Sequence, residues 1–196
     1  MGFQGANAAS LYSHSGHRKY LTPAERARFI VTAKACSRPE VGALCLTLAY
    51  TGCRISEALA LTRSSVEAEN GFIAIRSLKK RNGAMVVREI PVPADLLNAL
   101  CGAPFAGRRA NERLWRLSRS RAWQLVKEVM AQADIPAGVH ATPKGLRHGF
   151  GLHAIRSDVP LNLVQRWLGH ASMETTAIYL QALGREEREI AARMWD

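Results

Sequence analysis

Four short segments of the chain carry side chains that could act on a phosphate ester. They are Thr51–Glu57, Lys144–His148, Leu168–His170 and Thr175–Tyr179. Arginine meets the negative charge that builds on non-bridging oxygens with a planar fork of donors, and it stays ionised at any working pH. A phenol acts as a nucleophile only when nearby positive charge favours the phenolate. The arginines of the first two segments and Tyr179 therefore form a candidate nucleophilic site.

Each of these residues also has a plain structural interpretation. Arg54 has Glu57 three residues further on and could form a salt bridge along one helical turn. Tyr179 has apolar neighbours and could be a core aromatic, and His170 could be a hydrogen-bonded structural histidine. Each segment alone is a weak signal, so the prediction of a nucleophilic site depends on their order and combination.

Helix-start signals and apolar spacing indicate the elements that hold these segments. A capping threonine, a proline and a glutamate open a helix at Thr22, and a second helix starts at Ser37 and ends at Gly52. Helical spacing resumes over 54–59. The remaining predicted helices cover about 94–100, 119–133, 144–156, 160–168, 173–183 and 186–195.

The apolar period changes between the helices. Residues 72–76 and 85–90 are β-rich, and the segment Lys79–Gly83 between them contains the Asn-Gly pair typical of hairpin turns. We therefore expect a mainly α (α+β) domain with one small antiparallel β-hairpin.

The basic charge indicates a polyanionic partner. The 196 residues include 27 Lys and Arg and 16 Asp and Glu, which gives a formal charge of +11. Two basic clusters stand out, Arg76–Arg88 and Arg108–Arg121, and either one alone could be a solvated face. Together they favour a phosphate backbone. The hydrophobic share of 47% is enough to bury a core, which excludes a disordered tail.

Other features bear on compartment and on competing functions. Residues 1–21 are expected to be a flexible arm or an expression remnant, without a signal peptide, and no apolar run could span a bilayer. Four cysteines without paired spacing indicate reduced thiols, so we expect a cytoplasmic protein. A low aromatic content disfavours an RNA-binding module, and the scattered aspartates disfavour a two-metal nuclease.

The four segments in this order, with a basic hairpin between the first two, resemble the catalytic domain of the tyrosine recombinases, or phage-type integrases. The resemblance runs from about Thr22 to about Trp195. It implies the catalytic-domain fold over 22–196, with the family's N-terminal core-binding domain absent. The arm of residues 1–21 could not form that second domain, so this would be a short form or an isolated catalytic domain.

The resemblance implies a role for each matching residue. Arg54 and Arg147 would clamp the phosphate, His170 would hydrogen-bond the phosphate or the tyrosine, and Tyr179 would attack. A hairpin lysine would protonate the departing 5′ oxygen, with Lys79 favoured over Lys80. The full expected set is Arg54, Lys79, Lys144, Arg147, His170 and Tyr179 for catalysis, Lys80, Arg81, Arg76, Arg119 and Arg121 for DNA binding, and Glu57 and His148 for support.

One departure from the family pattern affects the chemistry. Lys144 stands where the family commonly has histidine, and an ammonium can donate to a phosphate but is a poor base. The group that deprotonates Tyr179 is therefore left open.

The implied activity is cleavage and rejoining of double-stranded DNA through a 3′-phosphotyrosyl intermediate, without metal, ATP or other cofactor. The family assembles as tetramers on DNA, so we expect a tetramer of this chain on DNA, and a monomer or weak dimer when it is free. The segment Glu186–Trp195 would dock on a neighbouring protomer or, alternatively, pack on its own domain. The alternative function is an accessory or regulatory DNA-binding protein that keeps the fold.

Overall fold

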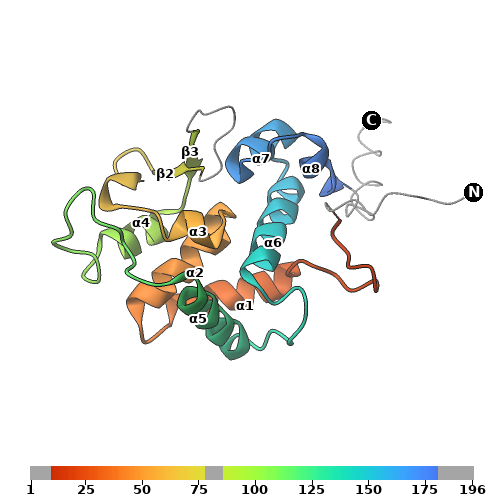
Figure 1. The fold of residues 1–196 in the computed structure, drawn as a ribbon, viewed down its shortest axis with the longest axis horizontal. Coiled ribbons are helices and arrows are strands. Elements are labelled where there is room, and N and C mark those ends of the chain that lie inside the picture. The colour runs from red at the N-terminus through yellow and green to blue at the C-terminus, as the bar shows by residue number, and fades with distance from the viewer. Residues whose placement is uncertain (1–9, 78–85, 181–196) are drawn as a thin grey trace, which may run out of the picture.

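A computed structural model describes residues 10–77 and 86–180 of the chain (Figure 1). The long helices are α1 (Pro23–Lys34), α2 (Pro39–Thr51), α4 (Ala94–Cys101), α5 (Arg119–Gln132), α6 (Pro143–Arg156) and α7 (Leu161–Leu168). The short elements are α3 (Ile55–Ala58), the 3-10 helix η1 (Arg63–Ser65), α8 (Glu174–Ala177) and the strands β1 (Val66–Glu67), β2 (Phe72–Arg76) and β3 (Val87–Pro91). The mainly helical fold with a small antiparallel sheet is confirmed.

Most helix ends in the described part of the chain follow the predicted signals. Thr22 Oγ1 accepts the backbone N–H of Glu25, and the Glu25 carboxylate accepts the N–H of Thr22, which completes a capping box. The second helix begins one residue later than predicted, because Arg38 rather than Ser37 occupies the cap and no side chain bonds there. Pro39 alone fixes this start, since its backbone angle already suits a first turn.

The sheet has three antiparallel strands in the order β1-β2-β3, one more than the predicted hairpin. Ile73 pairs with Ile90 on one side and with Val66 on the other. The strand β1 has only two residues, too few to give a periodic signal. The predicted turn over 79–83 lies outside the described residues.

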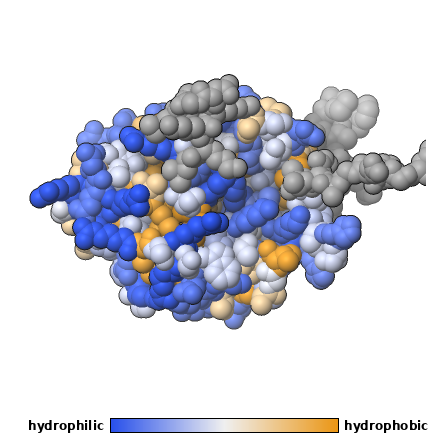
Figure 2. All heavy atoms as spheres, in the orientation of Figure 1, coloured by the Kyte–Doolittle hydropathy of each residue, from blue (hydrophilic) through white to orange (hydrophobic). Residues whose placement is uncertain are grey.

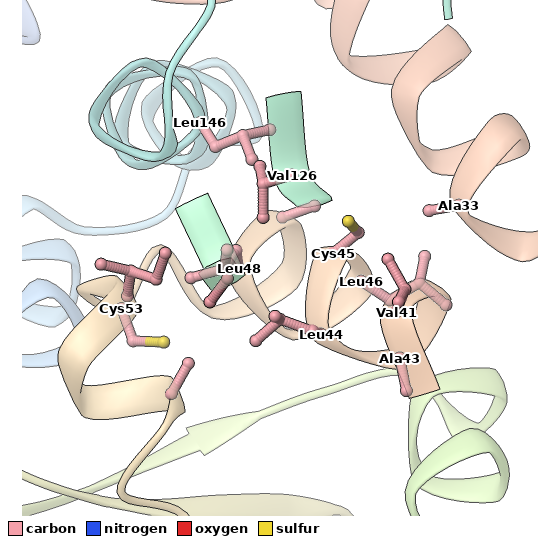
Figure 3. Close-up of a cluster of buried hydrophobic side chains, with 14 of the residues drawn as sticks. Ala33, Val41, Ala43, Leu44, Cys45, Leu46, Leu48, Cys53, Val126 and Leu146 are labelled. Carbon is pink, nitrogen blue, oxygen red and sulfur yellow. The ribbon is translucent and has the colours of Figure 1, made fainter. Parts of the chain in front are cut away.

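Helix α2 forms the centre of the larger apolar core. Its side chains Leu44, Cys45 and Leu48 are buried and contact helices on several sides. Figure 3 shows them beside Val126 of α5 and Leu146 of α6. A helix that is apolar all round in this way is one enclosed by its neighbours.

A second apolar cluster joins α6 to α7 and to the residues that follow α8. Phe150, Val164, Leu168, Ile178 and Tyr179 are buried together there. Because α6 contributes to both clusters, it links the two parts of the domain that Figure 1 shows on either side of α3. The candidate site is built where these parts meet.

Residues 10–21 differ from the flexible arm expected for 1–21. Leu11 and Leu21 are buried, and an isolated bridge joins Tyr12 to Arg18. Arg18 also forms a salt bridge with the capping residue Glu25. A few apolar anchors and one ion pair hold this segment on the domain, and its polar composition did not reveal them.

The described residues contain no group of three metal-ligating side chains and no helix that is long and apolar enough to cross a membrane. All four cysteines are free, and Cys45 and Cys53 are buried. Burial raises the pKa of the Cys53 thiol to about 11, which suits an unreactive core thiol.

Candidate active site

Arg54 lies at the turn where α2 ends and α3 begins. Gly52 has a φ of 60°, and a Cβ at this position would lie 2.5 Å from the Phe150 ring. Only glycine accepts both this backbone and this close approach. The Arg54 side chain is 40% exposed, and its Nη1 donates to Glu57 Oε1 over 2.9 Å. The salt bridge considered from the sequence is therefore present, and it leaves the guanidinium open to solvent.

Glu57 is buried and also pairs with an arginine that the sequence reasoning missed. Arg88 of β3 donates through Nη2 to Glu57 Oε2 over 2.6 Å and through Nε to the Trp167 carbonyl over 2.7 Å. Burial opposes ionisation of Glu57, but the hydrogen bonds and charge of Arg88, followed by Arg54, outweigh it and lower the pKa of Glu57. The strand alternation that puts Arg88 on the face of buried Ile90 could have revealed it.

Arg147 comes from α6 and is held by the ends of two other helices. Its Nη1 donates to the Gly52 carbonyl over 2.8 Å, and its Nη2 donates to the Leu168 carbonyl over 2.7 Å. Burial, followed by the charge of Arg54, lowers the pKa of Arg147 to about 10, which leaves it cationic at neutral pH. The same helix presents Lys144 to the cavity described below.

His170 follows the left-handed Gly169 that ends α7. Its Nδ1 is 2.8 Å from Thr176 Oγ1, and its ring stacks on that of Tyr179 with 6.3 Å between centroids. Burial, followed by the charge of Arg147, lowers the pKa of His170 to about 3, so this imidazole is neutral at physiological pH. Thr176 is a second functional contact that sequence reasoning missed.

Tyr179 is fully buried, and its hydroxyl faces α6. Its Oη is 3.2 Å from His148 Nδ1, and a Cβ on Gly151 would lie 2.5 Å from its Cζ. Burial raises the pKa of Tyr179 to about 12 although Arg147 opposes the shift, so the phenol is protonated at neutral pH. The helix predicted over 173–183 is described only as far as residue 180, and there the α-helical part is the four residues of α8, because the chain turns at 178–179 and buries the ring.

A cavity of about 670 Å³ collects these side chains from α3, α6 and the segment after α7. Its lining includes Arg54, Lys144, Arg147, His148, His170 and Tyr179, together with Arg119 and Trp123 of α5. Five of the six residues expected to be catalytic therefore meet in one place. The sixth, Lys79, lies outside the described residues.

The residues expected to bind DNA are less closely grouped. Arg119 lines the same cavity, whereas Arg121 lines a separate one and pairs with Glu128 over 3.3 Å. Arg76 is exposed at the end of β2. Lys80 and Arg81 fall outside the described part of the chain, as does Glu186–Trp195.

Comparisons of sequence agree with this geometry. The phage integrase family model matches residues 19–185. Tyrosine recombinase XerA of Pyrococcus furiosus is 31% identical over an alignment of 159 residues that covers 76% of this chain and 52% of that protein. Tyrosine recombinase XerD of Mycobacterium tuberculosis is 35% identical over an alignment of 161 residues that covers 75% of this chain and 50% of that protein. The chain thus spans about half the length of the curated relatives it matches.

Solved structures extend the comparison to the fold. The crystal structure of a XerA recombinase is 27% identical and superposes with a TM-score of 0.74, covering 89% of this chain and 64% of that one. The catalytic domain of bacteriophage HP1 integrase, at 22% identity and a TM-score of 0.64, shares the fold over 83% of this chain and 86% of its own. The resemblance drawn from the four segments is confirmed, and the chain belongs to the phage integrase family of tyrosine recombinases.

Proposed function

We propose that this chain cleaves and rejoins DNA strands through a covalent bond between Tyr179 and a 3′ phosphate, as a site-specific recombinase or integrase. The Tyr179 oxygen attacks the phosphorus, the bond to the 5′ oxygen breaks, and the phenol proton leaves. The observation that carries the proposal is the convergence of two arginines, one from the turn before α3 and one from α6, on a cavity that Tyr179 also lines.

In this proposal, Arg54 and Arg147 bind the non-bridging oxygens. Arg147 is held ready by the carbonyls of Gly52 and Leu168, and each bonded nitrogen of its guanidinium carries a second hydrogen for a phosphate. Preorganised donors of this kind stabilise the charge that develops in the transition state. Lys144 adds a third cation to the cavity, and His170 adds a neutral hydrogen-bonding group.

The departing 5′ oxygen needs a proton, and a lysine of the basic hairpin is proposed to supply it. Lys79 is favoured over Lys80, with Arg76 and Arg81 nearby in sequence to bind the backbone. The balance is then complete: one phosphodiester bond is exchanged for one phosphotyrosyl bond. The bond energy is kept, so rejoining needs no ATP.

The relatives support double-stranded DNA as the partner. They include a XerH site-specific recombinase bound to its difH substrate and a Tn1549 transposon integrase in complex with circular intermediate DNA. We propose that residues 22–196 act as the catalytic domain, in the cytoplasm, and that four protomers assemble on paired sites. Glu186–Trp195 is the proposed docking segment between protomers.

A covalent trap tests the cleavage step. Nicked duplexes with randomised sequence are incubated with the protein, and those that stay attached after denaturation are amplified through successive rounds. We expect a DNA–protein band that Tyr179→Phe abolishes while DNA binding persists. Tyr12→Phe is the matched control, because Tyr12 is exposed and is not among the residues that line the cavity. Binding without any adduct would instead favour an accessory DNA-binding protein.

A further inference from the structure

One step of the proposed reaction has no residue assigned to it among the expected set. This step is the transfer of the Tyr179 proton to a base. The family position that commonly holds histidine is Lys144 here, and a lysine ammonium has no lone pair to accept a proton. Burial keeps the phenol protonated at neutral pH, so attack without a proton acceptor would be slow. Some other group in the cavity must fill this role.

The hydrogen bonds of the described residues leave one candidate. His170 stacks on the Tyr179 ring, but in the described part of the chain no hydrogen bond joins it to Tyr179 Oη, and its Nδ1 pairs with Thr176 Oγ1 instead. His148 has its Nδ1 at 3.2 Å from Tyr179 Oη, within the distance expected of a general base. The His148 ring is buried, and it lines the cavity where the phosphate would enter.

We propose that His148 is a catalytic residue whose Nδ1 accepts the phenol proton of Tyr179 as the bond from Oη to phosphorus forms. This assignment rests on the proposed function. The phenol oxygen supplies the electron pair for the new bond, and the electron pair of the broken bond leaves with the 5′ oxygen, which the hairpin lysine protonates. On rejoining, His148 returns its proton to the departing phenol.

The surroundings of His148 keep it in the neutral form that a base requires. Burial, followed by the cationic groups around the ring, lowers the pKa of His148 to about 4. Among residues 10–77 and 86–180, nothing hydrogen-bonds to Nε2, so no carboxylate holds the ring as an imidazolium. The charged groups that act on the His148 ring are Lys144 and Arg147 on α6 and Lys19 from the segment before α1. The titratable groups beside it are His170 and Tyr179.

The entry of DNA changes this balance in the direction that the reaction needs. A phosphodiester brings negative charge into a cavity lined by Arg54, Lys144 and Arg147, and it offsets the cations that disfavour a protonated His148. The imidazole is therefore a stronger base when substrate is bound than when the site is empty.

His148→Asn tests the assignment, because asparagine can still accept a hydrogen bond near the Nδ1 position but takes up no proton. On a trapping duplex selected as above, we expect the rate of adduct formation to fall roughly 10²-fold. His153→Asn, on the exposed face of the same helix, is the matched control and should cleave at the wild-type rate. Circular dichroism and DNA binding check that both variants fold.

Two further readouts separate a base from a merely positioning histidine. The rate of His148→Asn should rise about tenfold per pH unit as more phenol ionises, whereas the wild-type rate should be flat near neutrality. A fluorinated tyrosine at position 179, with a more acidic phenol, should restore most of the lost rate in the variant. A loss that neither higher pH nor fluorotyrosine reduces would overturn the assignment.

Failure of the assignment and failure of the proposed function give different results. If His148→Asn cleaves as fast as the wild type, the proposed function stands and the assignment falls. If the wild type forms no adduct at Tyr179, both fall together.

Discussion

The Arg147 side chain is held in place by backbone carbonyls of the protein itself. Two backbone carbonyls from the ends of α2 and α7 fix both arms of its fork, and the surrounding core excludes water from it. Preorganisation of this kind lowers the reorganisation needed when charge develops on a phosphate. In the proposed reaction, Arg147 would therefore serve both catalysis and packing.

We expect Arg147→Lys to lower the rate of Tyr179 adduct formation roughly 10²-fold, because lysine keeps the charge and loses the fork. Stability should fall by about 1–3 kcal/mol, since at least one buried carbonyl loses its donor. Arg28→Lys is the matched control: Arg28 also donates to two carbonyls, those of Ala133 and Asp134, and is exposed on α1. The Arg28→Lys variant should form the Tyr179 adduct at the wild-type rate. An equal loss of that rate in both variants would contradict this role of Arg147.

The residues of the four segments could be predicted from the sequence, while the residues that support them could not. Arg54, Arg147, His170 and Tyr179 stand in short segments whose residue types already indicate phosphate chemistry. Arg88 and Thr176 acquire their roles only through contacts with residues distant along the chain or across a turn. Such contacts depend on strand register and helix packing, which short-range spacing does not specify.

A glycine of helix α6 lets Tyr179, the proposed nucleophile, pack close to the helix. A Cβ on Gly151 would lie 2.5 Å from Tyr179 Cζ, so alanine there must displace the ring. We expect Gly151→Ala to reduce adduct formation roughly 10²-fold, because small displacements of reacting groups have large effects on rate. Gly149→Ala on the same helix is the control: its Cβ would meet Leu21 instead, with 3.2 Å to the carbonyl oxygen. An unchanged rate in Gly151→Ala would contradict this role for the glycine.

The Glu57–Arg88 pair ties α3 to β3, and both side chains are buried. We expect Glu57→Gln to lower the free energy of unfolding by about 3–5 kcal/mol at pH 7, because it leaves Arg88 without its counter-charge. The pKa of Glu57 lies below its usual 4.5. The stability that it adds is therefore complete above pH 4.5 and is lost as pH falls through the folded-state pKa.

Urea unfolding of the wild type and the variant at several pH values measures this effect. The difference between them should shrink below pH 4.5. Glu112→Gln is the control, since Glu112 pairs with Arg108 and Arg116 nearer the surface and its loss should leave the free energy of unfolding nearly unchanged. A difference for Glu57→Gln that stays constant down to low pH would show that the carboxylate charge is unimportant.

Long elements were predictable where local signals agreed, and short ones were not. The Thr22 capping box, Gly52 and Gly169 mark helix ends in both sequence and structure. Up to residue 180, where the described part of the chain ends, the helix expected over 173–183 is the single turn of α8, because burial of Tyr179 against α6 overrides the local propensity. The flexible arm predicted for residues 1–21 fails over residues 10–21 for a similar reason, because the burial of Leu11 and Leu21 outweighs the polar composition of the segment.

The whole molecule carries a large positive charge, and the face seen in Figure 2 is mostly covered by hydrophilic side chains. Binding to DNA should therefore release counterions. If the domain neutralises about four phosphates, its affinity should fall about 10²-fold between about 50 and 200 mM salt. Fluorescence anisotropy with a labelled duplex measures this dependence. A change of less than about threefold over that range would mean that phosphate contacts contribute little.

The most direct test of the account is to identify the atom that becomes bonded to DNA. A trapped adduct is digested with nuclease and trypsin, and the peptide that carries nucleotide mass is sequenced by mass spectrometry. We predict the peptide 167–185, modified at Tyr179 and joined to the phosphate at a 3′ end. Modification of any other residue, or attachment to a 5′ phosphate, would contradict the central claim.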